Sequence, residues 1–143
     1  MSSSVRILVV EDFEPFRRFL CAMLQTIREE VQVSEASDGA LAVEQAQKLR
    51  PDLILLDIGL PKLNGVEAAR QIRKLSPESK ILFVSQESSS DLAHAAFDAG
   101  ANGYIVKTDV GSELVTGVNA VLRGKVFVST RLADHDFRQQ PAA

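Results

Sequence analysis

The sequence predicts an α/β domain built around a parallel sheet, and two observations support this prediction. Short apolar segments of strand type alternate with longer segments in which apolar residues recur at helical spacing, and this pair occurs five times. Strands that alternate with helices in this way are joined by right-handed crossovers, which make the strands parallel. The third strand segment, residues 53–56, is wholly aliphatic, as expected of a strand covered on both faces.

The expected strands follow one another along the whole chain. They are residues 5–10, 31–34, 53–56, 81–84 and 104–106. Residues 31–34 alternate between apolar and polar side chains, which suits an edge strand with one face in water, whereas the other segments are almost entirely apolar. An edge position for the second strand favours the order 2-1-3-4-5. The predicted fold is therefore a flavodoxin-like (βα)5 domain, a doubly wound five-stranded parallel sheet.

The expected helices carry boundary signals of their own. Pro15 suits the first turn of the helix that follows the first strand. Asn64 can cap the third helix, and Ser88 followed by Asp91 resembles a capping box that opens the fourth. Gly124 suits the end of the fifth helix. These signals agree with the strand–helix alternation that the predicted fold requires.

Length, charge and cysteine content limit the classes of protein. The 143 residues suit one domain, and a net charge of −3 provides no basic surface for nucleic acid, so we expect no direct DNA binding by this chain. The single cysteine, Cys21, excludes an internal disulfide framework and suits a reducing compartment. No apolar run approaches the roughly 18 residues of a membrane span. We therefore expect a cytoplasmic protein without a membrane segment.

Chemically useful side chains stand at the ends of four of the expected strands. Glu11 and Asp12 follow the first strand, Asp57 the third, Ser85 the fourth and Lys107 the fifth. Because parallel strands end at the same edge of a sheet, residues far apart in the sequence are expected to converge there. The sequence therefore predicts one site that contains three carboxylates, a hydroxyl and an ammonium group.

Such a cluster has a definite chemistry. Two unit charges about 4 Å apart repel by roughly 4 kcal/mol at an effective dielectric constant of 20, so crowded carboxylates raise their pKa values or recruit a cation. All-oxygen ligands select a hard ion, and Mg²⁺ that retains several waters suits a shallow polar crevice. With the ion present, Asp57 could attack a phosphoryl group and form an aspartyl phosphate.

The same residues carry a resemblance to a known family. The pair Glu11-Asp12, the segment in which Asp57 precedes residues 59–61, Ser85 and Lys107 resemble the phosphorylation site of response-regulator receiver domains of two-component signalling. The resemblance extends over residues 5–124, which we assign to the receiver domain. Residues 103–107 and 120–125 most resemble receivers that are fused to helix-turn-helix transcription factors.

The resemblance implies a role for each residue of the site. Asp57 would accept a phosphoryl group from a sensor histidine kinase or phosphotransfer protein, assisted by Lys107 and Ser85. The Mg²⁺ ligands would be Glu11, Asp12, Asp57 and a backbone carbonyl near Gly59. Ser85 and Tyr104 would form the switch pair, a hydroxyl drawn to the phosphoryl group and an aromatic ring that reorients behind it.

The implied function is a phosphorylation-dependent signalling switch. The protein would not be a conventional enzyme, although it could catalyse its own phosphorylation and a slow dephosphorylation. Phosphorylation would shift the fourth helix, the fifth strand and the fifth helix, and this face would contact a partner or form a homodimer.

The sequence departs from the family pattern at three places. Gln86 follows Ser85 where a small residue is usual, and Thr108 follows Lys107 where proline is common. No helix-turn-helix domain follows Gly124, so residues 125–143 are interpreted as a C-terminal linker-like tail. The chain is either a stand-alone receiver or a fragment of something longer.

Three alternatives remain open at this stage. A degenerate receiver would act as a constitutive protein-binding module. A nucleotide or flavin binder of the same fold would need a loop rich in Gly, Ser or Thr after the first strand, where this chain has the acidic segment 11–14. A hydrolase with an aspartyl intermediate would need a second acid near Asp57, and residues 58–60 contain none.

Overall fold

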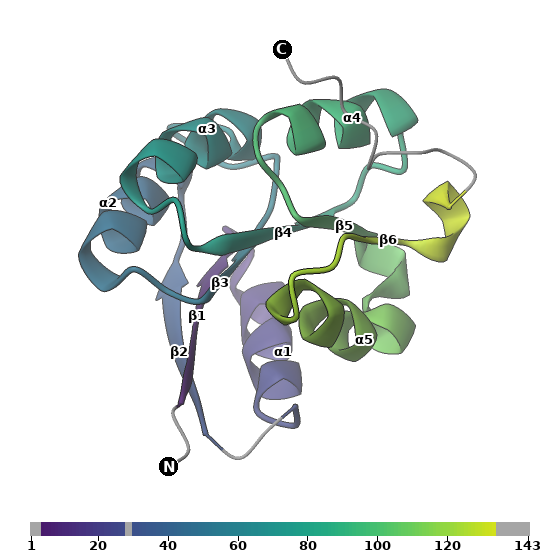
Figure 1. Ribbon diagram of the computed structural model, residues 1–143, viewed down its shortest axis with the longest axis horizontal. Coiled ribbons are helices and arrows are strands. Elements are labelled where there is room, and N and C mark those ends of the chain that lie inside the picture. The colour runs from purple at the N-terminus through teal and green to yellow at the C-terminus, as the bar shows by residue number, and fades with distance from the viewer. Residues whose placement is uncertain (1–3, 28–29, 134–143) are drawn as a thin grey trace.

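A computed structural model describes residues 4–27 and 30–133, in which a parallel sheet lies between two layers of helices (Figure 1). The strands are β1 (Val5–Val10), β2 (Val31–Ala36), β3 (Leu53–Leu56), β4 (Lys80–Ser85), β5 (Gly103–Val106) and β6 (Phe127–Val128). The helices are α1 (Glu14–Leu24), α2 (Gly39–Leu49), α3 (Gly65–Leu75), α4 (Ser90–Asp98) and α5 (Val110–Leu122), with short 3-10 helices η1 (Lys107–Asp109) and η2 (Thr130–Leu132). Helices α2, α3 and α4 cover one face of the sheet, and α1 and α5 cover the other (Figure 1).

The sheet confirms the predicted flavodoxin-like fold. Its strand order is β2-β1-β3-β4-β5-β6, so the first five strands have the predicted order 2-1-3-4-5, with β2 at an edge. The structure adds one strand, β6, which pairs in parallel with Gly103 and Tyr104 of β5. A strand of two residues is too short to show any hydrophobic period, which is why the sequence does not predict it. The rest of the expected tail, residues 134–143, lies outside the described residues.

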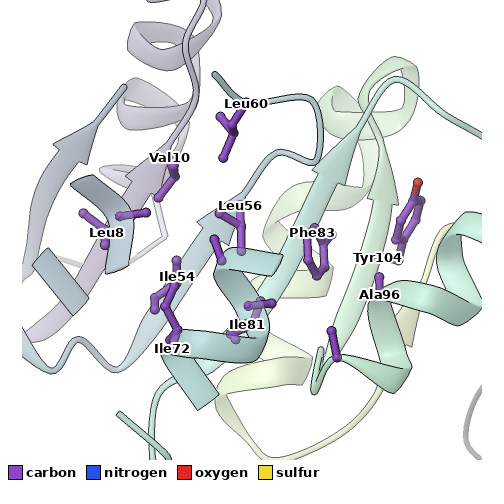
Figure 2. Packing of buried hydrophobic residues seen from close by; sticks show 14 of the residues in the cluster. Leu8, Val10, Ile54, Leu56, Leu60, Ile72, Ile81, Phe83, Ala96 and Tyr104 are labelled. Carbon is purple, nitrogen blue, oxygen red and sulfur yellow. The ribbon is translucent and has the colours of Figure 1, made fainter. Parts of the chain in front are cut away.

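The core follows the alternation of side chains along each strand. In β3, Leu53 and Leu55 point to the α1–α5 side, whereas Ile54 and Leu56 point to the α2–α4 side. Figure 2 shows the hydrophobic cluster on the α2–α4 side, where strand residues meet Ile72 of α3 and Ala96 of α4. Because β3 is covered on both faces, Asp57, the residue that follows it, is buried and not solvated.

The predicted helix signals are mostly confirmed. Pro15 lies in the first turn of α1, and the side chain of Asn64 accepts a hydrogen bond from Glu67 N (3.0 Å) as the cap of α3. The predicted cap of α4 is wrong by one residue, because Ser89 rather than Ser88 accepts from Leu92 N (3.3 Å). Consecutive serines have the same capping chemistry, so only the path of the chain decides between them. Among the described residues, no helix combines the length and the apolar character that crossing a membrane would require.

Candidate functional site

The carboxyl ends of β1, β3, β4 and β5 surround one open crevice with a volume of about 1020 Å³. Its lining includes six residues that the sequence predicts for the site, namely Glu11, Asp12, Asp57, Gly59, Ser85 and Lys107. The remaining lining residues are Phe13, Phe16, Ile58, Gln86, Glu87 and Thr108. The predicted convergence at this edge of the sheet is therefore present in the structure.

Three carboxylates form the acidic centre of the crevice. One carboxylate oxygen each from Glu11, Asp12 and Asp57 lies within 4.8 Å of the other two. Glu11 and Asp57 are buried, whereas Asp12 is exposed. Backbone groups orient the two buried ones, because Glu11 Oε2 accepts from Phe13 N (3.0 Å) and Asp57 Oδ1 accepts from Ile58 N (2.7 Å). Burial raises the pKa of Glu11 above its ordinary value, although its hydrogen bond with a lysine opposes this effect.

That lysine is Lys107, which lies between the two buried carboxylates. Its Nζ is 2.7 Å from Glu11 Oε1 and 3.3 Å from Asp57 Oδ2, and it also lies 4.9 Å from the centre of the Phe16 ring. Burial lowers the pKa of Lys107, but the hydrogen bond to Glu11 and the charge of Asp57 outweigh burial and raise the pKa overall. Lys107 is therefore a protonated counter-charge shared by two acids.

The donor set fits a small hard cation. Three carboxylates face one ammonium group, so the crevice keeps an excess of negative charge next to open space. Carboxylate oxygens are the ligands that Mg²⁺ prefers, and the exposure of Asp12 leaves room for retained waters. Gly59 is exposed on the crevice wall, and a Cβ there would meet nothing within 4 Å, so its backbone is accessible from the crevice.

The loop after Asp57 is closed by a tight approach to α3. Gly65 N donates to Ile58 O (2.8 Å), and a Cβ on Gly65 would lie only 2.0 Å from Asp57 O. Only glycine fits this contact, because any side chain would displace the backbone that carries Asp57. The glycine therefore holds the start of α3 against the carboxyl end of β3.

Ser85 and Tyr104 meet at the backbone of Glu87. The hydroxyl of Ser85, at the end of β4, accepts from Glu87 N (3.1 Å), and the hydroxyl of Tyr104 donates to Glu87 O (2.9 Å). Tyr104 is fully buried against Phe83 in the α2–α4 cluster (Figure 2), and burial raises its pKa above the ordinary value. The two residues of the expected switch pair are thus joined by one peptide segment.

Sequence reasoning missed several parts of this site. It did not single out Glu87, because backbone atoms make the contacts to the switch pair and any residue except proline could provide them. It also missed Phe13 and Phe16, which add apolar walls beside the acidic centre. Gln86 was considered as a neighbour of the crevice, and the structure brings it to the crevice wall with an exposed side chain.

The fold and the crevice place the chain in a class of protein. This class consists of flavodoxin-like domains with an acidic site at the carboxyl edge of the sheet. The family model described as "Response regulator receiver domain" matches residues 7–119. The chain therefore belongs to the family of response-regulator receiver domains, whose members are signalling proteins rather than conventional enzymes.

Named relatives agree with this assignment. The chain is 31% identical over 130 residues to the transcriptional regulatory protein DegU of Brevibacillus brevis, covering 91% of this chain and 55% of that protein. It is 33% identical over 122 residues to the response regulator VraR of Staphylococcus aureus, covering 85% of this chain and 58% of that protein. The chain thus spans a little more than half the length of these relatives.

Solved structures give the same result. A two-component response regulator of the LuxR family from Aurantimonas sp. SI85-9A1 superposes with a TM-score of 0.87 at 32% identity, covering 92% of this chain and 94% of that one. The receiver domain of the response regulator NarL from Mycobacterium tuberculosis superposes with a TM-score of 0.80 at 29% identity, covering 87% of this chain and 100% of that one.

Proposed function

We propose that this chain is a phosphorylation-dependent signalling switch in which Asp57 accepts a phosphoryl group from a sensor histidine kinase or phosphotransfer protein. The observation that supports this most strongly is the placement of Asp57. Its carboxylate ends the central strand, opens on a crevice and has a lysine Nζ 3.3 Å away. Membership of the receiver family supports a phosphoryl group as the ligand of this site.

The proposed transfer uses groups that are already oriented. An oxygen of Asp57 attacks phosphorus, a P–O bond forms, and the P–N bond to the donor imidazole breaks with its electron pair left on nitrogen, which takes up a proton. Lys107 neutralises charge on the phosphoryl oxygens. The Ser85 hydroxyl accepts from Glu87 N, so its own proton can be donated to a phosphoryl oxygen.

Mg²⁺ is the proposed cofactor. Glu11, Asp12 and Asp57 would hold it, together with a backbone carbonyl near Gly59. When bound, the ion supplies the positive charge that lets an anionic carboxylate and an anionic phosphoryl group approach each other. The remaining excess of carboxylate charge around Lys107 supports this assignment.

The wider biological setting is also part of the proposal. Residues 5–124 would form the receiver and residues 125–143 a connection, and the α4–β5–α5 face would contact a partner or a second copy. We place the protein in the cytoplasm and assign no DNA binding to this chain itself. The alternative of a degenerate, constitutive binding module would be expected to lack one of the site residues, whereas the sequence retains Glu11, Asp12, Asp57, Ser85 and Lys107.

Labelling with a small phosphodonor tests the proposal. We expect that acetyl phosphate with Mg²⁺ adds one phosphate to the protein, detected as intact mass, and that Asp57→Asn abolishes most of the adduct. Asp52→Asn is a matched control, because Asp52 precedes the same strand at the opposite edge of the sheet. An unmodified wild-type mass, under conditions that label a known receiver, would contradict the proposal.

A further inference from the structure

The segment formed by residues 127–132 is bound to the strand that leads into the phosphorylation site. Ser129 N donates to Tyr104 O (2.9 Å), and Val106 N donates to Ser129 Oγ (2.8 Å). Both bonds continue the pairing of β6 with β5 beyond the two residues of β6 itself. This C-terminal segment therefore covers the edge of β5, which carries Tyr104 and leads directly into Lys107.

Arg131 of the same segment forms hydrogen bonds with the turn that begins at Lys107. Its Nε donates to Asp109 Oδ2 (2.8 Å), and its Nη2 donates to Asp109 Oδ1 (2.7 Å) and to Thr108 Oγ1 (3.3 Å). Lys107, Thr108 and Asp109 together form η1. The guanidinium fork thus holds the two residues that follow the lysine, and a bidentate pair of this kind fixes direction as well as distance.

The C-terminal segment is anchored on both sides of Arg131. Thr130 donates to Glu113 Oε2 of α5 through its backbone N (3.1 Å) and its hydroxyl. Leu132 is 3% exposed and belongs to the same core cluster as Tyr104 and Ala96. In Figure 1 the segment lies beside the start of α5, at the yellow end of the colour range. Arg131 is therefore presented by a packed segment and not by a loose tail.

Lys107 depends on this support because its side chain is long. A lysine ammonium on four methylene groups has many rotamers, so its position between Glu11 and Asp57 requires a fixed backbone at its base. The backbone before Lys107 is held by Ser129, and the backbone after it is held through Arg131. Among the described residues, the side chains that contact the Lys107 ammonium are the two acids and the Phe16 ring.

We propose that Arg131 is a positioning residue for Lys107, acting through Asp109 and Thr108, and that it thereby couples the C-terminal segment to phosphorylation of Asp57. The inference rests on the proposed function. Coupling between two sites is reciprocal at equilibrium, so if docking of the segment stabilises the phosphorylated state, phosphorylation must stabilise the docked segment by the same factor. Residues 127–132, which include β6 at the edge of the sheet, are then expected to respond to the phosphoryl group.

The first experiment compares Arg131→Ala with Arg70→Ala in the full chain. Arg70 is a matched control, because it forms a surface ion pair with Glu67 (3.2 Å) and its side chain is 52% exposed, against 48% for Arg131. We expect Arg131→Ala to slow labelling by acetyl phosphate about three- to tenfold, less than the roughly hundredfold cost of misplacing a catalytic group by a full ångström. Arg70→Ala should label like the wild type, and equal rates for all three proteins would overturn the inference.

A double-mutant cycle separates positioning from a general structural effect. If Arg131 acts mainly through its bidentate pair with Asp109, the double variant Arg131→Ala/Asp109→Ala should label only slightly more slowly than Asp109→Ala alone, because only the longer contact with Thr108 (3.3 Å) remains to be lost. Arg131→Lys keeps the charge but not the fork, so it should recover only part of the rate. Losses that multiply in the double variant, or full recovery with lysine, would overturn the positioning role.

Amide exchange separates failure of this inference from failure of the proposed function. Without any phosphodonor, Arg131→Ala should exchange faster than the wild type at Lys107 to Val110, whereas Arg70→Ala should not. Unchanged exchange there would overturn the inference even if labelling of Asp57 succeeds. A wild type that takes up no phosphate would instead overturn the proposed function, whatever the exchange at η1.

Discussion

The two ends of β3 carry aspartates in opposite surroundings. Asp52 precedes the strand at the amino edge, is exposed and accepts a hydrogen bond from Arg6 N (2.9 Å). Asp57 follows the strand at the carboxyl edge, is 7% exposed and lies beside Lys107. The residue type is the same, so the difference in chemistry comes from what the fold assembles around each end.

The amino edge also has a cavity with charged side chains, yet among the described residues it has no cluster of three carboxylates like the one at the carboxyl edge. A hollow of about 330 Å³ there is lined by Asp52, Glu78, Lys80 and Arg123, among others, and three of these four are exposed. At the carboxyl edge, the helices begin, so backbone N–H groups are available to orient acids and hydroxyls, as Phe13 does for Glu11. The carboxyl edge therefore differs from the amino edge in the burial of its acids and in the backbone donors that orient them.

Replacing Lys107 should have the largest effect on the difference between the two edges of the sheet. Lys107→Met leaves Glu11 and Asp57 buried without their ammonium partner and removes the charge that would face a phosphoryl group. We expect labelling by acetyl phosphate to slow by roughly a hundredfold or more, as when a preorganised donor is lost from an active site. Lys80→Met at the amino edge is the control, and its labelling rate should match the wild type. Similar losses in the two variants would show that the site does not depend on Lys107.

Removing Asp12, the exposed acid of the crevice, should have the next largest effect, a loss of Mg²⁺ affinity. At about 4 Å, a unit charge attracts a divalent cation by roughly 2 kcal/mol even in water, which corresponds to about a thirtyfold change in affinity. Asp12→Ala should weaken Mg²⁺ binding by about this factor, measured by calorimetry or by tyrosine fluorescence. Asp52→Ala should leave the affinity unchanged. Equal affinity in Asp12→Ala and the wild type would contradict the assignment of Asp12 as a ligand.

Titration of the single tyrosine measures how buried the carboxyl edge is. The chain has one tyrosine and no tryptophan, so absorbance at 295 nm reports on Tyr104 alone. Burial raises the pKa of Tyr104 above 10.0, which means that the folded state favours the neutral phenol. This contribution to stability is complete below the unfolded pKa and is lost as the pH rises through the folded pKa. Tyrosinate should therefore appear at higher pH in the native protein than in urea, and coincident titrations would contradict the burial.

The smallest expected effect concerns the residue on the crevice wall. Gln86 is exposed there, and its side chain is longer than the small residue that the family usually has at this place. We expect it to hinder the water that would hydrolyse an aspartyl phosphate, so Gln86→Ala should shorten the phosphorylated lifetime by a few fold and speed labelling by small donors. Gln71→Ala, on the exposed face of α3, is the control. An unchanged lifetime would exclude this role, and a longer one would mean that Gln86 positions the water.

Much of the fold and the centre of the site could be predicted from the sequence. The aliphatic run that precedes Asp57 identifies a strand buried on both faces, and strand–helix alternation makes the sheet parallel. Parallel strands must end at one edge, so the meeting of Asp57, Glu11 and Lys107 follows from topology alone, although their residues are separated by long stretches of chain. The position of the acidic crevice therefore follows from two things. One is the periodic pattern of apolar residues, and the other is the rule that parallel strands end at one edge of the sheet.

The tertiary structure decided the features that depend on single long-range contacts. Strand β6 has two residues and no period, and the pair between Arg131 and Asp109 joins residues 22 positions apart without a sequence signal. Tyr104 and Ser85 meet through the backbone of Glu87, which any residue except proline could provide. Periodicity reports which face of an element is buried, but it carries no information about which backbone atoms or charged side chains meet across the fold. Those contacts depend on the assembled three-dimensional path of the chain.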